Sequence, residues 1–137
     1  MLKNILFAAF FILVMFSCSD PKKEKPATAL DTGREFIRAS LNGDFKMAES
    51  LLLMDTQNIQ LFESYKIYFE RLPKEKKQHY KEASYEINKY ADIDDSTTII
   101  NYSNDYMNKP MDIKVIRQNK AWYIDFKYTY SGNLPID

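Results

Sequence analysis

The spacing of apolar residues changes near residue 84, and this change constrains the fold more than any other feature of the sequence. Between residues 28 and 83 the apolar side chains recur every three or four positions, which is typical of amphipathic helices. From Ser84 onward β-branched and aromatic residues alternate with polar ones, which is typical of strands that bury one face. Helices followed by an antiparallel sheet with one apolar face predict an α+β domain of two layers.

Three helices are predicted before residue 74. The first begins at Thr28, whose side chain can cap a helix start, and ends at Gly43, a residue suited to a left-handed C-cap. A short second helix follows, and the third begins within residues 55–58 and ends at Pro73, which cannot continue a helix. Residues 74–77 are all charged and are expected to form a solvated turn or the end of a helix.

Four strands are predicted in the second half of the chain, at residues 84–90, 96–103, 111–118 and 121–128. The last two form a hairpin that turns at residues 119–120. Arg117 then lies opposite Trp122, and Ile113 lies opposite Phe126. These residues belong to the apolar face, which we expect to pack against the helices.

The other face of this hairpin supports the same alignment. Lys114 lies opposite Asp125 and Asp112 lies opposite Lys127, so two pairs of opposite charge meet across the strands. A shift by one residue would break both pairs and mix the apolar and polar faces. The pattern therefore selects one register and predicts that the Asp125 carboxylate faces outward.

The first eighteen residues have the layout of a secretory signal. A basic residue, Lys3, precedes a continuous apolar run from Ile5 to Phe16. At about 1.5 Å per residue this run reaches roughly 18 Å, which is shorter than the ~30 Å hydrocarbon core of a bilayer. Residues 1–17 are therefore expected to be a signal peptide. Two alternatives to a lipoprotein signal remain. The segment could be a simple secretory signal followed by an incidental cysteine, or it could be an anchor that is not cleaved.

The end of this signal, Met15-Phe16-Ser17-Cys18, resembles the lipobox of bacterial lipoproteins. The resemblance implies that Cys18 is lipidated and becomes the new amino terminus. The polar, proline-bounded residues that follow predict a flexible tether at residues 18–27, and the helical periodicity after it places the domain at residues 28–137. The resemblance also implies attachment to a membrane of the bacterial cell envelope, for which we favour the outer membrane. Cys18 is the only cysteine, so lipidation would leave no thiol for disulfides, metal sites or catalysis.

A family resemblance is carried by residues 35–37, 41–45 and 51–52, together with Ala48 and the late segment 120–126. With these segments the domain resembles the small bacterial lipoproteins of the nuclear-transport-factor-two-like superfamily, and the resemblance covers nearly all of the mature chain. It implies a cone, also described as a cystatin-like fold, in which N-terminal helices pack on the concave face of a bent antiparallel sheet of about four strands. This branch of the superfamily is largely uncharacterised, so the resemblance implies a fold more than an activity.

No catalytic constellation is found in the sequence. Dehydratases of the superfamily use a pair of histidines with an aspartate, whereas His79 is the only histidine here. Isomerases of the superfamily need an inward aspartate, and Asp125 is expected to face outward. Epoxide hydrolases of this fold bracket an arginine with two aspartates, and Arg117 has no acidic neighbour on its face. We therefore expect no enzyme activity and no cofactor.

Other ligand classes also lack their usual signals. The 19 basic and 19 acidic side chains balance, whereas nucleic-acid binders usually carry a basic surplus. The sequence has no cluster of histidine and cysteine for zinc. Asp92, Asp94 and Asp95 lack the glycine and distal glutamate of a calcium loop and are expected to form a solvated turn. We therefore expect no nucleic acid and no metal site.

The aromatic content is the remaining unusual feature, because ten of the 137 residues are tyrosines. Tyrosine offers an apolar ring with a polar tip, which suits a ligand pocket or a protein interface. The candidate ligand-binding residues are Arg117, Trp122, Tyr102 and Tyr85. The structural alternatives are that strands simply favour tyrosine, and that Arg117 and Trp122 form a cation–π pair that closes one end of the sheet.

Two functions follow as expectations. The first is a membrane-anchored envelope lipoprotein that acts without catalysis, as a binding or accessory module for a small apolar or aromatic ligand or for an envelope protein partner. The alternative is an enzyme of the isomerase or hydrolase type that uses the pocket of the cone. An inward carboxylate would favour the enzyme.

Overall fold

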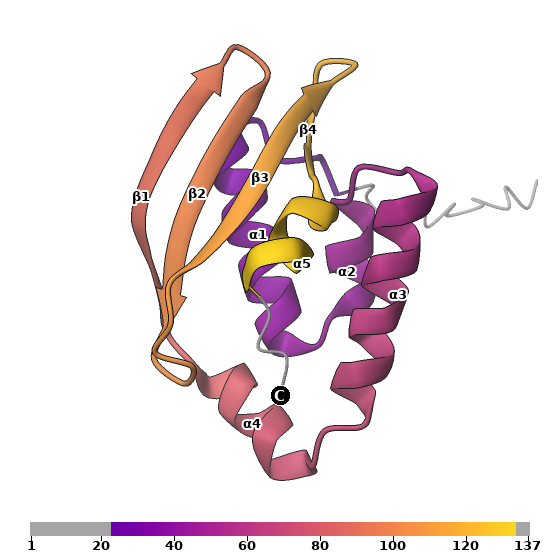
Figure 1. Ribbon diagram of the computed structural model, residues 1–137, viewed down its shortest axis with the longest axis vertical. Coiled ribbons are helices and arrows are strands. Elements are labelled where there is room, and N and C mark those ends of the chain that lie inside the picture. Colours follow the sequence, from indigo (N-terminus) through magenta and orange to yellow (C-terminus); the bar gives the residue numbers. More distant parts are fainter. Residues whose placement is uncertain (1–22, 134–137) are drawn as a thin grey trace, which may run out of the picture.

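The computed structural model describes residues 23–133, and the side chains of this part up to residue 129. Four helices come first: α1 (Ala29–Asn42), α2 (Phe45–Ser50), α3 (Thr56–Glu70) and α4 (Lys74–Glu82). Four strands follow: β1 (Tyr85–Asp94), β2 (Thr97–Asn104), β3 (Met111–Gln118) and β4 (Ala121–Ile124), and the described chain ends in α5 (Phe126–Asn133). The strands form one antiparallel sheet in the order β1-β2-β3-β4, so the protein has the predicted α+β fold (Figure 1). The predicted signal peptide and Cys18 lie outside the described residues.

The helix starts follow from local capping. The Thr28 side chain accepts a hydrogen bond from the Asp31 backbone N–H at 3.1 Å, and α1 ends at Gly43, which has a φ of 71°. The Asp55 carboxylate accepts a hydrogen bond from the Asn58 N–H at 2.8 Å and thereby caps α3. These three positions confirm the predicted boundaries.

The charged segment after Pro73 differs from the prediction, because it begins a complete helix rather than a turn. None of the residues of α4 is buried. Its sequence is rich in lysine, glutamate and glutamine, which are good helix formers. Tyr80 fixes it to the domain, since its ring centroid lies 5.9 Å from that of Phe69 and 4.7 Å from that of Tyr106.

The hairpin of β3 and β4 has the predicted register. Arg117 pairs with Trp122, and the turn residues Asn119 and Lys120 both have positive φ angles, as a two-residue hairpin turn requires. The Lys114 ammonium lies 3.8 Å from the Asp125 carboxylate, which confirms the predicted pairing, but Asp125 is buried because α5 packs against β3.

The predicted last strand is too long, because β4 stops at Ile124 and α5 begins at Phe126. The expected pairs of Ile113 with Phe126 and of Asp112 with Lys127 are therefore wrong. Two contacts from outside the sheet explain the change. The segment around Leu52 pairs with Ile124 on the outer edge of β4, and the buried Asn58 side chain accepts a hydrogen bond from the Lys127 N–H at 2.8 Å.

The first strand is longer than predicted and extends to Asp94. Asp92 therefore lies in β1 rather than in a turn, and its carboxylate accepts a hydrogen bond from the Thr98 hydroxyl at 2.6 Å. The pairing of β1 with β2 is irregular at two points, next to Asn88 and next to Ile93.

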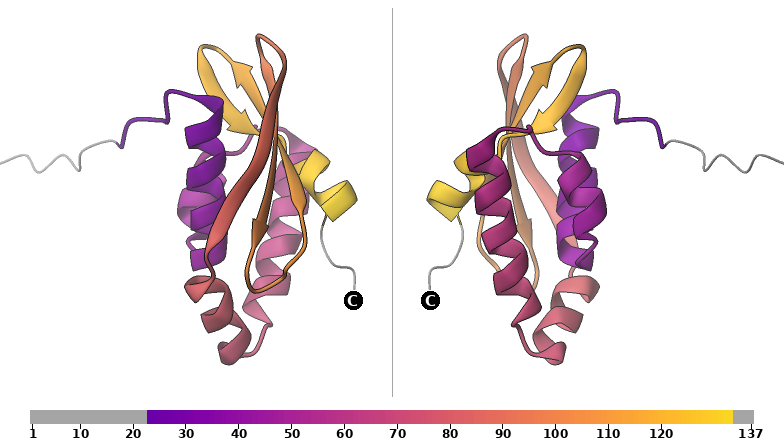
Figure 2. Two further views of the ribbon diagram at one scale, coloured as in Figure 1. Left: turned by 90° about the vertical axis from the view of Figure 1, so that its left-hand side faces the viewer. Right: turned by 90° about the vertical axis from the view of Figure 1, so that its right-hand side faces the viewer.

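One face of the sheet and α1 form the centre of the core. Ile100, Ile113, Val115 and Ile124 alternate along the strands and are fully buried. Helix α1 approaches closely because Gly33 has no side chain; a Cβ at this position would collide with Cδ1 of Ile100. Helices α1 and α5 lie on opposite sides of the sheet (Figure 2).

Candidate functional site

The four residues predicted to bind a ligand share one face of the sheet but do not form one site. Tyr102 pairs with Met111 at one end of β3, and Arg117 lies at the other end. Six residues of strand separate these positions by about 20 Å. Arg117 is exposed and its Cζ lies 5.8 Å from the centroid of the Trp122 ring. This geometry matches the cation–π pair that closes the end of the sheet.

Tyr85 lies beneath an arginine of α1. Cζ of Arg38 is 5.2 Å from the centroid of the Tyr85 ring, and both terminal nitrogens of Arg38 donate to the Ala83 carbonyl oxygen at 3.3 Å. The arginine therefore fastens α1 to the start of β1, and Tyr85 forms part of that structural contact.

Tyr102 belongs to a group of tyrosines from three different elements. Burial raises the pKa of Tyr102, and the nearby phenol of Tyr80 raises it further. Burial also raises the pKa of Tyr65, and Tyr102 and Tyr80 are among the groups that add to this shift. The pKa of Tyr80 is raised by burial first and by Tyr68 and Tyr106 next. We call Tyr65 in α3, Tyr80 in α4, Tyr102 in β2 and Tyr106 the tyrosine cluster.

Phenylalanine rings pack against the tyrosine cluster. The Tyr65 ring makes edge or tilted contacts with Phe45 and Phe126, each at a centroid distance of 5.8 Å. It also lies 6.4 Å from Phe69, which in turn contacts Tyr80. The walls around the phenol groups are therefore apolar, and they are built by residues far apart in the sequence.

The phenol hydroxyls of the tyrosine cluster have few hydrogen-bond partners within the described residues. Within the described residues, the Tyr65 and Tyr80 hydroxyls have no hydrogen-bond partner, and the Tyr102 hydroxyl donates only to the thioether of Met111 at 3.9 Å. Both Tyr65 and Tyr102 keep part of their surface accessible, although burial raises the pKa of both. Both tyrosines therefore lie at the edge of the core, with aromatic side chains on one side and accessible surface on the other.

Sequence analysis missed Tyr65 and Tyr80 as site residues. Both lie on helices, where an aromatic residue at helical spacing is expected to belong to the core. The strand pattern identified Tyr102 alone. Tyr65 and Tyr80 come near Tyr102 only through the tertiary fold, in which α3 contacts α5 and α4 contacts α1.

Of the groups suited to catalysis, His79 touches the outer edge of the tyrosine cluster at Tyr106, and Asp125 lies apart from it. His79 is exposed, stacks on the Tyr106 ring at 5.2 Å and lies 3.7 Å from the Glu75 carboxylate. The buried Asp125 carboxylate lies between two ammonium groups, 3.8 Å from Lys114 and 3.9 Å from Lys127. In residues 23–133, no group of three or more histidines and carboxylates is arranged to hold a metal ion.

Comparisons of the chain with protein-family models, with curated proteins and with solved structures find no match. The resemblance to a lipoprotein superfamily therefore remains a prediction. Within the described part of the chain, no helix is long and apolar enough to cross a membrane.

Proposed function

We propose that this protein is a lipid-anchored binding module of the bacterial cell envelope that holds a small aromatic or apolar molecule at the tyrosine cluster. The observation that carries the proposal is the state of Tyr65 and Tyr102. Burial raises the pKa of both phenols, neither hydroxyl has a strong hydrogen-bond partner within the described residues, and both residues keep part of their surface accessible. Membership of the nuclear-transport-factor-two-like superfamily is part of the proposal, and the order of helices before the sheet supports it.

The chemistry of the cluster indicates which ligands it would favour. Aromatic walls bind flat apolar groups, and a small number of placed polar groups fix their orientation. A phenol without a strong protein partner gains a hydrogen bond when the ligand supplies an acceptor such as a carbonyl oxygen. Each such bond contributes about 1 kcal/mol. The expected ligand is therefore an uncharged aromatic or apolar molecule with at least one acceptor.

The isomerase or hydrolase alternative receives less support from these residues. Such reactions need an acid or a base at the reacting atoms. Tyr65 and Tyr102 supply only phenols, whose pKa burial shifts further from neutrality, and the one imidazole that touches the cluster, His79, is exposed and stacks on the outer ring of Tyr106. A binding role uses the same phenols in their neutral form.

Attachment to the membrane follows from the sequence. The lipobox-like segment ends at Cys18, and the polar residues after it lead directly to the described domain, which begins with α1 at Ala29. Several acyl chains on one cysteine would hold the domain stably at a membrane surface. The outer membrane is the proposed location.

Binding can be tested with prodan, an uncharged naphthalene dye whose carbonyl accepts hydrogen bonds and whose emission reports its surroundings. We expect saturable binding at one site for each protein molecule. Replacing Tyr65→Phe and Tyr102→Phe keeps both rings and removes both donors. At about 1 kcal/mol for each bond, each substitution should weaken binding about fivefold.

Tyr90→Phe is the matched control, because Tyr90 lies in β1, is 55% exposed and is not part of the tyrosine cluster. It should leave the dissociation constant of prodan unchanged. The proposed site is wrong if prodan binds without saturation, or if the double variant binds it as tightly as the original chain does.

A further inference from the structure

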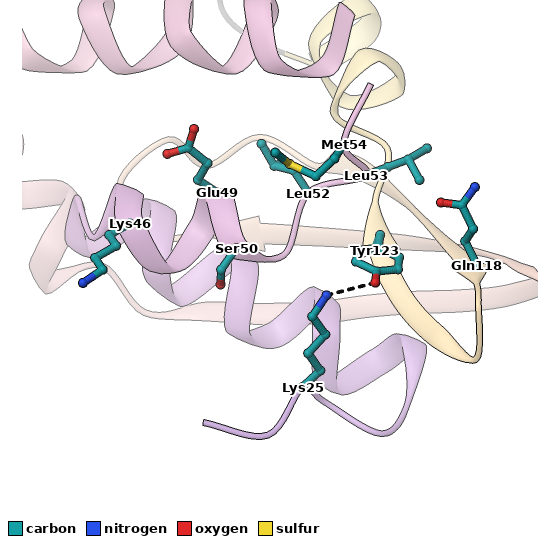
Figure 3. A pocket seen from close by; sticks show the side chains of 9 residues that line it. All are labelled: Lys25, Lys46, Glu49, Ser50, Leu52, Leu53, Met54, Gln118 and Tyr123. Atoms are coloured by element: carbon teal, nitrogen blue, oxygen red, sulfur yellow. Dashed lines mark hydrogen bonds between the residues drawn. The ribbon is translucent and has the colours of Figure 1, made fainter. Parts of the chain in front are cut away.

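The start of the described chain is held against the side of the domain. Nζ of Lys25 donates to the hydroxyl of Tyr123 at 2.9 Å and lies 4.1 Å from the centroid of its ring (Figure 3). Nζ of Lys23 lies 3.5 Å from the Glu35 carboxylate. Both lysines contact the folded domain, so the tether is fastened beside β4 before α1 begins.

The tether is short between this point and the proposed anchor. Only residues 18–22 separate the sulfur-bound lipid from Lys23. A fully extended chain of this length spans at most about 18 Å. The surface around Tyr123 must therefore stay close to the bilayer, whereas α4 lies at the opposite end of the long axis of the molecule (Figures 1 and 2).

A surface pocket of about 490 Å³ opens where the tether is fastened. Figure 3 shows Lys46 and Gln118 at its two ends, with Lys25 and Tyr123 between them. Part of the lining is apolar and accessible, since Met54 is 65% exposed.

The charges around the pocket favour an anion. The lining contains Lys25 and Lys46 and one carboxylate, Glu49. That carboxylate lies 3.8 Å from the ammonium of Lys66, outside the lining, whereas within the described residues Lys46 has no carboxylate partner. Two lysines and an exposed methionine around one pocket suit the boundary between phosphate headgroups and acyl chains.

From these observations we infer that the pocket faces the bilayer and takes the phosphate headgroup of an anionic phospholipid in the leaflet that carries the anchor. The inference rests on the proposed function, because it requires lipidated Cys18. Lysines near an anionic membrane surface each strengthen the contact about fivefold. Met54 would lie against the upper part of the acyl chains.

The orientation can be tested with the full lipidated chain in vesicles of phosphatidylcholine and phosphatidylglycerol that contain a spin label on the headgroup. Lipidation consumes the only native thiol, so Met54→Cys and Lys76→Cys can each be labelled with a fluorophore. Lys76 is exposed in α4 and serves as the control for the far end of the domain. We expect at least threefold stronger quenching at position 54 than at position 76.

Charge reversal tests the headgroup assignment. Both substitutions are introduced into the labelled Met54→Cys chain. Lys46→Glu should lower the quenching in vesicles that contain phosphatidylglycerol to the level found in pure phosphatidylcholine. The control Lys76→Glu should leave the quenching unchanged. Equal quenching in both lipids, with no effect of Lys46→Glu, overturns the assignment.

Failure of the anchor is distinguishable from failure of this inference. A chain that takes up no labelled fatty acid and does not float with vesicles refutes the proposed anchoring, and the inference falls with it. A chain that floats but is quenched equally at positions 54 and 76 refutes only the inferred orientation.

Discussion

The buried side chain of Asn58 joins three parts of the chain, and its removal should destabilise the domain strongly. Asn58 is 0% exposed. Its amide nitrogen donates to the Leu53 carbonyl oxygen and to the Asp55 carboxylate, both at 3.1 Å, and its amide oxygen accepts from the Lys127 N–H at 2.8 Å. This last bond holds the first turn of α5 against the start of α3.

The cost of Asn58→Ala follows from these bonds. The Leu53 carbonyl oxygen still accepts from the Asp55 N–H, and the Asp55 carboxylate still contacts the Lys127 ammonium. Only the Lys127 N–H is left without a partner, which costs about 1–3 kcal/mol, and the two donated bonds contribute about 0.5–1.5 kcal/mol each. The expected loss in the free energy of unfolding is about 4 kcal/mol, which lowers the melting temperature by about 16 °C.

Thermal and urea unfolding, followed by circular dichroism and by Trp122 fluorescence, measure this loss. Asn88→Ala is a matched control, because the exposed Asn88 also donates two side-chain hydrogen bonds, to Asn101 and Ser103, both at 2.8 Å. Water replaces these bonds, so the control should change stability by about 0.5 kcal/mol or less. Equal losses in the two variants would refute the reasoning.

Three further predictions concern the acid stability, the core and the anchor. The hydrogen bond from Lys127, followed by that from the Asn58 N–H, lowers the pKa of Asp55 below 3.8, so this carboxylate stabilises the fold above about pH 4 and loses that effect as the pH falls through its folded pKa. The urea midpoint should therefore fall less steeply on acidification in Asp55→Asn, and an unchanged profile would contradict this. Gly33→Ala should destabilise the fold by about 1–2 kcal/mol, because its methyl group meets Ile100, although alanine favours a helix; a raised urea midpoint would argue against the packing described. Cys18→Ala should move the protein from the membrane fraction to the soluble fraction and abolish uptake of labelled fatty acid; retention in the membrane fraction would show that the lipid is not the anchor.

The sequence predicted correctly the hairpin register and the helix starts, which depend on contacts between residues close together in the chain. The register of β3 and β4 follows from alternating faces and from the pairing of Lys114 with Asp125. The starts of α1 and α3 follow from the capping side chains of Thr28 and Asp55. In each case the decisive contact joins residues that are close in the sequence or face each other across a hairpin.

Long-range contacts decided the parts that the sequence did not predict. Residues 121–128 alternate as a strand should, yet β4 ends because Asn58, 69 positions away, binds the Lys127 N–H. The candidate site also depends on contacts between residues that are far apart in the sequence. Tyr102 has a strand signal, whereas Tyr65 and Tyr80 join it only through the packing of α3 and α4, which no local pattern encodes.

The central claim, that the tyrosine cluster holds a small molecule, is tested most directly by native mass spectrometry of the full chain extracted gently from the envelope. The account predicts a discrete added mass that is released on unfolding, differs from lipid and detergent, and is reduced in the Tyr65→Phe, Tyr102→Phe double variant. The mass of the lipidated protein alone, with no small molecule released on unfolding, would contradict it.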